Sequence, residues 1–147
     1  PLWYFGFGAN INPWKLRVKR RILPLEEVPG SLPGWRLVFN HKGGMGNIEP
    51  LADGGAAADG GPSAVHGMLL KLTAKDMDRL SQIEHEYGTT DVDVESYDGR
   101  SIRAKAYVSP PEWKLPTYPA PPERYLNLIK EGCASMGIEQ AYQVWLQ

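Results

Sequence analysis

The stretch Tyr4-Phe5-Gly6-Phe7-Gly8-Ala9-Asn10 runs an aromatic strand into a turn of glycine, alanine and asparagine. Asn12-Pro13 then starts a helix, because Asn is a good N-cap and Pro is favoured at the first helical position. Glycine lets a ligand approach main-chain N–H groups closely, and a helix start directs further N–H groups at an anion. The pattern predicts a loop that binds a carboxylate-like group, although it also fits an ordinary tight turn.

The composition restricts the class of protein. The chain has 147 residues, which fits one domain over residues 1–147 with a core of its own. The net charge of −1, from 16 basic and 17 acidic residues, attracts neither nucleic acid nor an anionic membrane. No apolar run approaches the roughly 20 residues that span a bilayer. The lone cysteine, Cys133, suits a reducing compartment, so we expect a cytoplasmic protein of undefined oligomeric state.

Apolar patterning and turn residues divide the chain into elements. Besides the first strand, strands are predicted at residues 35–40, 46–51 and 65–72. Pro29-Gly30 and Pro33-Gly34 predict turns, and residues 53–63 predict a mobile loop. Helices are predicted at residues 13–21, after Thr73, and at 125–136 before Gly137, with a last turn or two behind a proline-rich tether at 110–122.

A hairpin around Tyr97-Asp98-Gly99 has a register that the sequence predicts. With Gly99 in the left-handed position of a three-residue loop, apolar residues meet on one face and opposite charges on the other. The expected pairs are Val94 with Ile102, Val92 with Ala104, Asp93 with Arg103, and Asp91 with Lys105. Strands with few intervening helices predict an α+β fold: a small mixed, largely antiparallel β-barrel or sheet with peripheral helices.

Glu84 is the strongest acid–base candidate. The helix after Thr73 carries Met77 and Leu80 on one face, and Glu84 falls on the same stripe seven residues after Met77. A carboxylate in that position either reaches water or lines a cavity. Glu86, two residues further on, is expected to point elsewhere.

Other chemistries find little support in the sequence. His41, His66 and His85 fall in different elements without ligand spacing, so no metal site is predicted. Cys133 lies on the apolar stripe of its predicted helix and is expected to be a small buried residue rather than a nucleophile. Tyr125 lies on that stripe too, and from the pattern alone it is a core residue.

Taken together, these segments resemble the γ-glutamylcyclotransferase family. Residues 4–10 resemble the family's opening Tyr-Phe-Ala-Tyr-Gly-Ser-Asn, and Leu80-Ser81-Gln82-Ile83-Glu84 resembles its Leu-Asp-x-x-Glu. The order Tyr125, Ile129, Gly132, Gly137 is similar to the family's C-terminal Tyr-x-x-x-Ile-x-x-Gly-Ala-x-x-x-Gly-Leu. The resemblance covers nearly the whole chain in the same order and implies the family's small mixed barrel with a substrate cavity.

The resemblance also implies a reaction and its residues. The family converts a γ-glutamyl group into 5-oxoproline without a cofactor, and the resemblance implies Glu84 as catalytic acid and base. It implies a small-molecule γ-glutamyl substrate bound by Phe7, Gly8, Ala9, Asn10, Ile11 and Tyr125. Phe7 and Ala9 replace the family's Tyr and Ser, and Ser81 and His85 replace its Asp and Gly, so His85 is expected to narrow the pocket or perturb Glu84. Alternatives are a non-catalytic ligand- or protein-binding member of the fold and a cyclotransferase for γ-glutamylamines.

Overall fold

Five strands close into a barrel in the computed structural model, which describes residues 1–52 and 60–147. Their order around the barrel is β1 (Leu2–Gly6), β5 (Ala64–Leu72), β2 (Glu26–Pro33), β6 (Gly88–Ser96) and β7 (Ser101–Val108). All neighbours are antiparallel except β1 and β7, which close the barrel in parallel at Tyr4 and Lys105. The predicted α+β class with a mixed, largely antiparallel barrel is confirmed.

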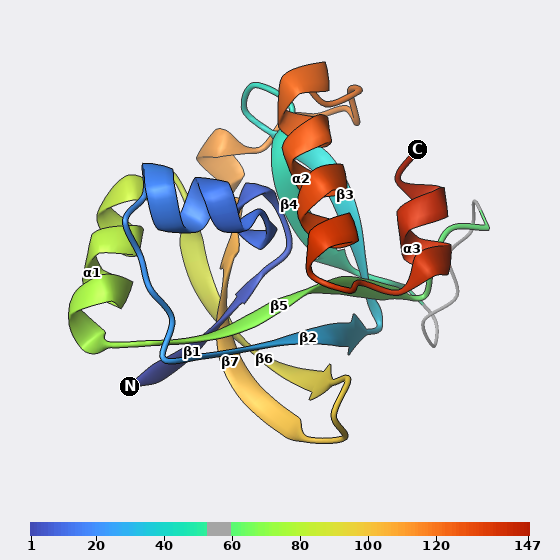
Figure 1. Cartoon of the computed structure of the whole chain (residues 1–147). Helices are drawn as coiled ribbons and strands as arrows, with labels where there is room; N and C mark the ends of the chain where they lie inside the picture. The colour runs from blue at the N-terminus through green and yellow to red at the C-terminus, as the bar shows by residue number, and fades with distance from the viewer. Residues whose placement is uncertain (53–59) are drawn as a thin grey trace.

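A second sheet and the helices lie outside the barrel (Figure 1). The second sheet pairs β3 (Trp35–His41) with β4 (Met45–Pro50). The helices are α1 (Ala74–Ile83), α2 (Glu123–Ser135) and α3 (Gln140–Trp145), joined by short helical turns at Ala9–Ile11, Trp14–Lys19 and Pro111–Trp113. In Figure 1, α1 lies on one side of the molecule, and α2 and α3 lie on the other. No helix in residues 1–52 or 60–147 is long and apolar enough to cross a membrane.

Strand β2 corrects the predicted turn at Pro29-Gly30. The predicted turn at Pro33-Gly34 is confirmed, because Gly34 lies in a turn between β2 and β3 with φ +80. Glu26–Pro33 is one continuous strand that pairs with β5 along its whole length. Pro29 is tolerated in the strand because its carbonyl accepts a hydrogen bond from the N–H of Tyr97. Proline has no N–H of its own, so no donor is left unpaired at this position. At Gly30 an added Cβ would lie 2.9 Å from Cγ1 of Val94, so close strand packing, rather than a turn, requires this glycine.

The hairpin of β6 and β7 has the predicted register, with all four expected pairs formed and Gly99 at φ +91. Thr73 caps α1 as predicted, because its Oγ1 accepts the N–H of Asp76 at 3.1 Å. Gly137 follows α2 with φ +75, which confirms the predicted helix end. The loop predicted over residues 53–63 lies mostly outside the described residues.

The N-terminal segment is anchored against α2. Asn12 lies just before the helical turn at Trp14–Lys19, where its Oδ1 accepts the N–H of Trp14, and its side-chain amide donates to the carbonyl of Leu128. An added Cβ on Gly132 would lie 2.7 Å from the main-chain nitrogen of Asn12, so α2 approaches this segment through a glycine. The helical turn stops earlier than predicted, because Arg21 adopts φ +56. Arg20, directly before this bend, lines a cavity.

Candidate active site

One cavity of about 200 Å³ collects most of the residues that the sequence singled out. Its lining includes residues separated by more than 100 positions in the chain, namely Phe7, Gly8, Ala9, Asn10, Glu84 and Tyr125. The sixth predicted binding residue, Ile11, does not line it. Ile11 is buried in the core, and its N–H donates to the carbonyl of Gly8 at 3.1 Å, so that N–H is already engaged.

The loop of Gly8, Ala9 and Asn10 lines the cavity and carries three main-chain N–H groups. Within the described part of the chain, no acceptor lies in hydrogen-bonding range of these three N–H groups. The amide of Asn10 donates to the hydroxyl of Tyr4 at 2.9 Å, while its Oδ1 is buried without a partner among described residues. Buried polar atoms left unsatisfied are rare in folded proteins. The loop is therefore prepared for a polar ligand.

The Tyr125 hydroxyl lies between two glycines. It accepts the N–H of Gly46 at 3.0 Å, and a Cβ added to either Gly8 or Gly46 would lie 2.8 Å from its oxygen. Burial raises the pKa of Tyr125 to about 12, so its proton is retained at neutral pH. The hydroxyl thus remains available as a donor toward the cavity.

Glu84 is paired with a residue that the sequence did not single out as functional. Oε1 of Glu84 lies 2.9 Å from Nη1 of Arg20, and both side chains are about one-sixth exposed. The contact is an ion pair without hydrogen-bond geometry, since Nε and Nη1 of Arg20 have no hydrogen-bond partner in the described residues. Arg20 is one of five basic residues in the segment 15–21, and nothing in the local sequence distinguishes it or indicates that the chain bends at Arg21.

The prediction that Glu86 points away from Glu84 is wrong, because both residues line the same cavity. The helical spacing that placed the two carboxylates on different faces ends at Ile83, where α1 ends, and Glu84 already has ψ 37. Oε1 of Glu86 lies 3.6 Å from Nε2 of His41, which also lines the cavity. His85 is exposed and is absent from the lining, so the expectation that it narrows the pocket is wrong.

Aromatic residues complete the wall. Tyr4, Tyr87 and Tyr107 all line the cavity, and the Tyr87 hydroxyl donates to the carbonyl of Gly46 at 3.0 Å. Ser81, where the resembling family has Asp, lies 2.7 Å from the Tyr107 hydroxyl through its Oγ. Alternation in β7 places Tyr107 on the face of Arg103 and Lys105, so the strand pattern does not indicate that Tyr107 lines a cavity.

A wider groove of about 1030 Å³ continues from the cavity. The two share Ala9, Arg20, Met45 and Tyr125 in their linings. The groove adds Trp14 and the three cations Lys15, Lys19 and Arg124, against Glu123 and Glu131. No group of three His, Cys, Asp or Glu side chains in residues 1–52 and 60–147 is arranged to hold a metal ion.

Residues 64–146, more than half of the chain, match the model of the AIG2-like family. The chain belongs to the AIG2-like family. No curated protein matches the sequence significantly.

Solved structures share the fold of this AIG2-like chain. YkqA from Bacillus subtilis has a TM-score of 0.80 at 20% identity and covers 99% of this chain, which spans 52% of YkqA. A structure titled gamma-glutamyl cyclotransferase has a TM-score of 0.76 at 18% identity, covering 99% and 85% of the two chains. A yeast gamma-glutamyl cyclotransferase titled as specific to glutathione has a TM-score of 0.68 at 12% identity, covering 99% and 93%.

Proposed function

We propose that this chain is a γ-glutamyl cyclotransferase. The α-amino nitrogen of a γ-glutamyl group attacks its own γ-carbonyl carbon, the bond to the leaving nitrogen breaks, and 5-oxoproline and an amino acid or amine are released. The observation that carries the proposal is the single cavity lined by Glu84, the loop at residues 8–10 and Tyr125. Membership of the AIG2-like family and the fold shared with proteins titled gamma-glutamyl cyclotransferase support it.

Glu84 carries the proton between the two nitrogens. The attacking nitrogen loses a proton as its bond to the γ-carbon forms, and the leaving nitrogen must gain one as its bond breaks. One carboxylate acting first as base and then as acid performs both steps. Arg20, at 2.9 Å, holds that carboxylate at the edge of the cavity.

The loop and Tyr125 fold the substrate for cyclisation. N–H groups of Gly8, Ala9 and Asn10 bind the α-carboxylate or the developing oxyanion, and the Tyr125 hydroxyl donates a further hydrogen bond. Because nucleophile and electrophile belong to one molecule, holding the cyclising conformer contributes up to several kcal/mol, on the order expected for oriented intramolecular reactions. No cofactor takes part in this chemistry.

The groove favours a leaving group that bears a carboxylate. The cavity of about 200 Å³ suits the γ-glutamyl group, and the groove that continues from it takes the rest of the substrate. Lys15, Lys19 and Arg124 make no ion pair with a carboxylate in the described residues, so they are free to bind one. A γ-glutamyl peptide fits this environment better than a γ-glutamylamine, whose leaving group becomes a cation.

A non-catalytic ligand-binding protein is the second candidate. Two observations favour it: the ion pair that occupies Glu84, and the absence of hydroxyls at Phe7 and Ala9 on the loop. Under this alternative, a γ-glutamyl compound binds and is recovered unchanged.

The decisive experiment incubates the protein with γ-glutamylalanine, glutathione and ε-(γ-glutamyl)lysine and quantifies 5-oxoproline by mass spectrometry. We expect turnover, fastest with the peptides, and a roughly 10²- to 10⁴-fold loss in Glu84→Gln. Glu95→Gln, the same change on an exposed strand residue, is the matched control and should keep full activity. Unchanged turnover in Glu84→Gln eliminates the mechanism, and binding without 5-oxoproline supports the second candidate.

A further inference from the structure

His41 is a buried imidazole that lines the cavity and has one nitrogen without a hydrogen-bond partner in the described residues. The residue ends β3, is 1% exposed and lines the cavity. Its Nε2 has no hydrogen-bond partner within the described residues, and the nearest charged atom is Oε1 of Glu86 at 3.6 Å. An unpartnered buried polar atom is costly unless a ligand satisfies it. Nothing in the proposed chemistry so far uses this pair.

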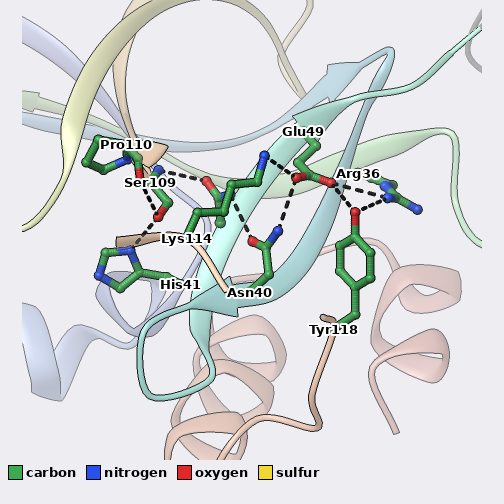
Figure 2. Close-up of polar contacts among 9 residues, drawn as sticks. Arg36, Asn40, His41, Glu49, Ser109, Pro110, Lys114 and Tyr118 are labelled. Atoms are coloured by element: carbon green, nitrogen blue, oxygen red, sulfur yellow. Dashed lines mark hydrogen bonds and ion pairs between the residues drawn. The ribbon is translucent and has the colours of Figure 1, made fainter. Parts of the chain in front are cut away.

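A polar network holds the His41 ring in place (Figure 2). Nδ1 lies 2.8 Å from Oγ of Ser109, and that hydroxyl donates to the carbonyl of Pro110 at 3.4 Å. When Ser109 donates its one hydroxyl proton to Pro110, it accepts from Nδ1–H, and this tautomer of His41 leaves the lone pair on Nε2. The main-chain N–H of Ser109 donates to Asn47, which continues the network through Asn40 to Glu49.

Ring packing fixes the orientation of the imidazole. The ring stacks on Tyr87 with centroids 4.0 Å apart and an interplanar angle of 13°, and Trp113 lies beyond at 6.3 Å. Five side chains from three segments lie around the ring: the carboxylates Glu84 and Glu86 and the neutral groups Tyr87, Ser109 and Trp113. Burial lowers the pKa of His41, while the nearby Glu86 carboxylate and the charge of Glu84 oppose that shift.

The substrate of the proposed function brings a group that complements this pair. A γ-glutamyl compound carries an α-ammonium at neutral pH, and it must lose one proton before its nitrogen has a lone pair for attack. Glu84 is already paired with Arg20, whereas Glu86 offers negative charge and Nε2 of His41 offers a lone pair. The cavity thus holds two carboxylates with different partners, an arrangement that separates proton-transfer roles.

We infer that His41, supported by Glu86, binds the α-ammonium group and takes its first proton. The proton moves from the ammonium nitrogen to Nε2, giving a neutral amine and an imidazolium beside the Glu86 carboxylate. Glu84 then moves the second proton from the attacking to the leaving nitrogen, and the imidazolium returns its proton to water. This inference rests on the proposed function and assigns a second proton acceptor to it.

The test measures kcat/KM for γ-glutamylalanine against pH. At pH 7 we expect His41→Asn to lose about 10- to 100-fold, with recovery towards pH 9, where the amine deprotonates by itself. Glu86→Gln should raise KM and move the ascending limb to lower pH, because the carboxylate that favours the imidazolium is gone. His66→Asn replaces a buried histidine that does not line this cavity, and should keep the wild-type profile.

Thermal melts identify variants that fail to fold, and His41→Gln then provides a second neutral replacement. A wild-type pH profile in folded His41→Asn overturns the inference and leaves the proposed function intact. If the wild-type protein turns over no γ-glutamyl compound, calorimetric measurements of the binding of γ-glutamylalanine and its N-acetyl derivative test the ammonium site separately. A preference for the free amine that is lost in His41→Asn supports the ammonium site; equal or absent binding overturns it.

Discussion

Charged residues of the β6–β7 hairpin and of the cavity follow different physical rules. On the hairpin, Arg103 and Asp93 pair at 3.0 Å with both side chains about two-thirds exposed. In the cavity, Arg20 and Glu84 pair at 2.9 Å with about one-sixth exposed. Exposed ion pairs lose little hydration on folding and contribute little stability. Burying two charges costs on the order of several kcal/mol of hydration free energy, and the attraction between the charges must offset this cost. Stability alone does not explain the cavity pair.

Breaking the cavity pair should give the largest effect. Arg20→Met removes the group that holds the Glu84 carboxylate, and we expect kcat/KM for γ-glutamylalanine to fall by about 10²-fold, the cost of a small misplacement. Steady-state kinetics measure this change. Arg17→Met, on the same helical turn but paired with Glu27, is the control and should keep near wild-type activity. Increased activity in Arg20→Met would show that the pair restrains Glu84 instead.

Glu49 is a charged residue outside the cavity whose side chain is as buried as those of the cavity pair (Figure 2). Burial opposes ionisation, but hydrogen bonds from four residues hold the pKa of its carboxyl at about 2, namely Lys114, Asn40, Tyr118 and Arg36. A carboxyl whose pKa is lower in the folded than in the unfolded protein stabilises the fold at pH values above its unfolded-state pKa. This stabilisation is lost as the pH falls towards the folded-state pKa. Glu49→Gln should lower the free energy of unfolding by about 2 kcal/mol at pH 7, and the difference should shrink from pH 4.5 to pH 2.

Urea denaturation at each pH measures this difference. Exposed Glu112, on the segment that carries Lys114, is the control, and Glu112→Gln should change stability little at any pH. A loss in Glu49→Gln that is independent of pH would mean that packing, rather than charge, is responsible.

A substitution in the neutral wall of the cavity should change stability and activity less than the substitutions of charged residues. Gly46→Ala places a Cβ 2.8 Å from the Tyr125 hydroxyl, so we expect about 1 kcal/mol of destabilisation and a several-fold rise in KM. Gly88→Ala is the matched control, because its Cβ would meet only the carbonyl of Val108 at 3.8 Å. Equal behaviour of the two variants in melting and kinetics would remove Tyr125 from the site.

The hairpin should give the smallest effect. Asp93→Asn breaks an exposed pair and should change the Tm by about 1 °C or less, with unchanged activity. Differential scanning calorimetry at low and high salt measures it. A large, salt-sensitive loss would show that exposed pairs matter more in this barrel than the comparison assumes.

The features predicted from sequence are those that depend on neighbours in the chain or on one periodicity. Alternation sets the register of Val92 and Val94 against their partners, because successive strand residues face opposite sides. Helical spacing set Glu84 on the stripe of Met77 and Leu80, and the structure puts it at the cavity. The family resemblance connected the loop at residues 8–10 and Tyr125 to Glu84, which no local pattern does.

The features that were missed depend on where regular structure stops or on distant partners. Glu86 reaches the cavity because α1 ends at Ile83, and Arg20 lines it directly before the bend at Arg21. Strand β2 was hidden because the pairing that accommodates Pro29 involves Tyr97, almost 70 residues away. Local propensity contains no information on such contacts.

The sequence by itself determined the α+β class, the hairpin, the caps and the family, because periodicity, turn residues and motif order are local properties of the chain. Only the tertiary structure decided which groups share the cavity. Barrel closure brings β1 beside β7, and the second sheet carries His41 to the side of Glu86. Charges and hydrogen bonds act over a few ångströms of space, so the environment of each ionisable group follows from the fold rather than from its neighbours in sequence.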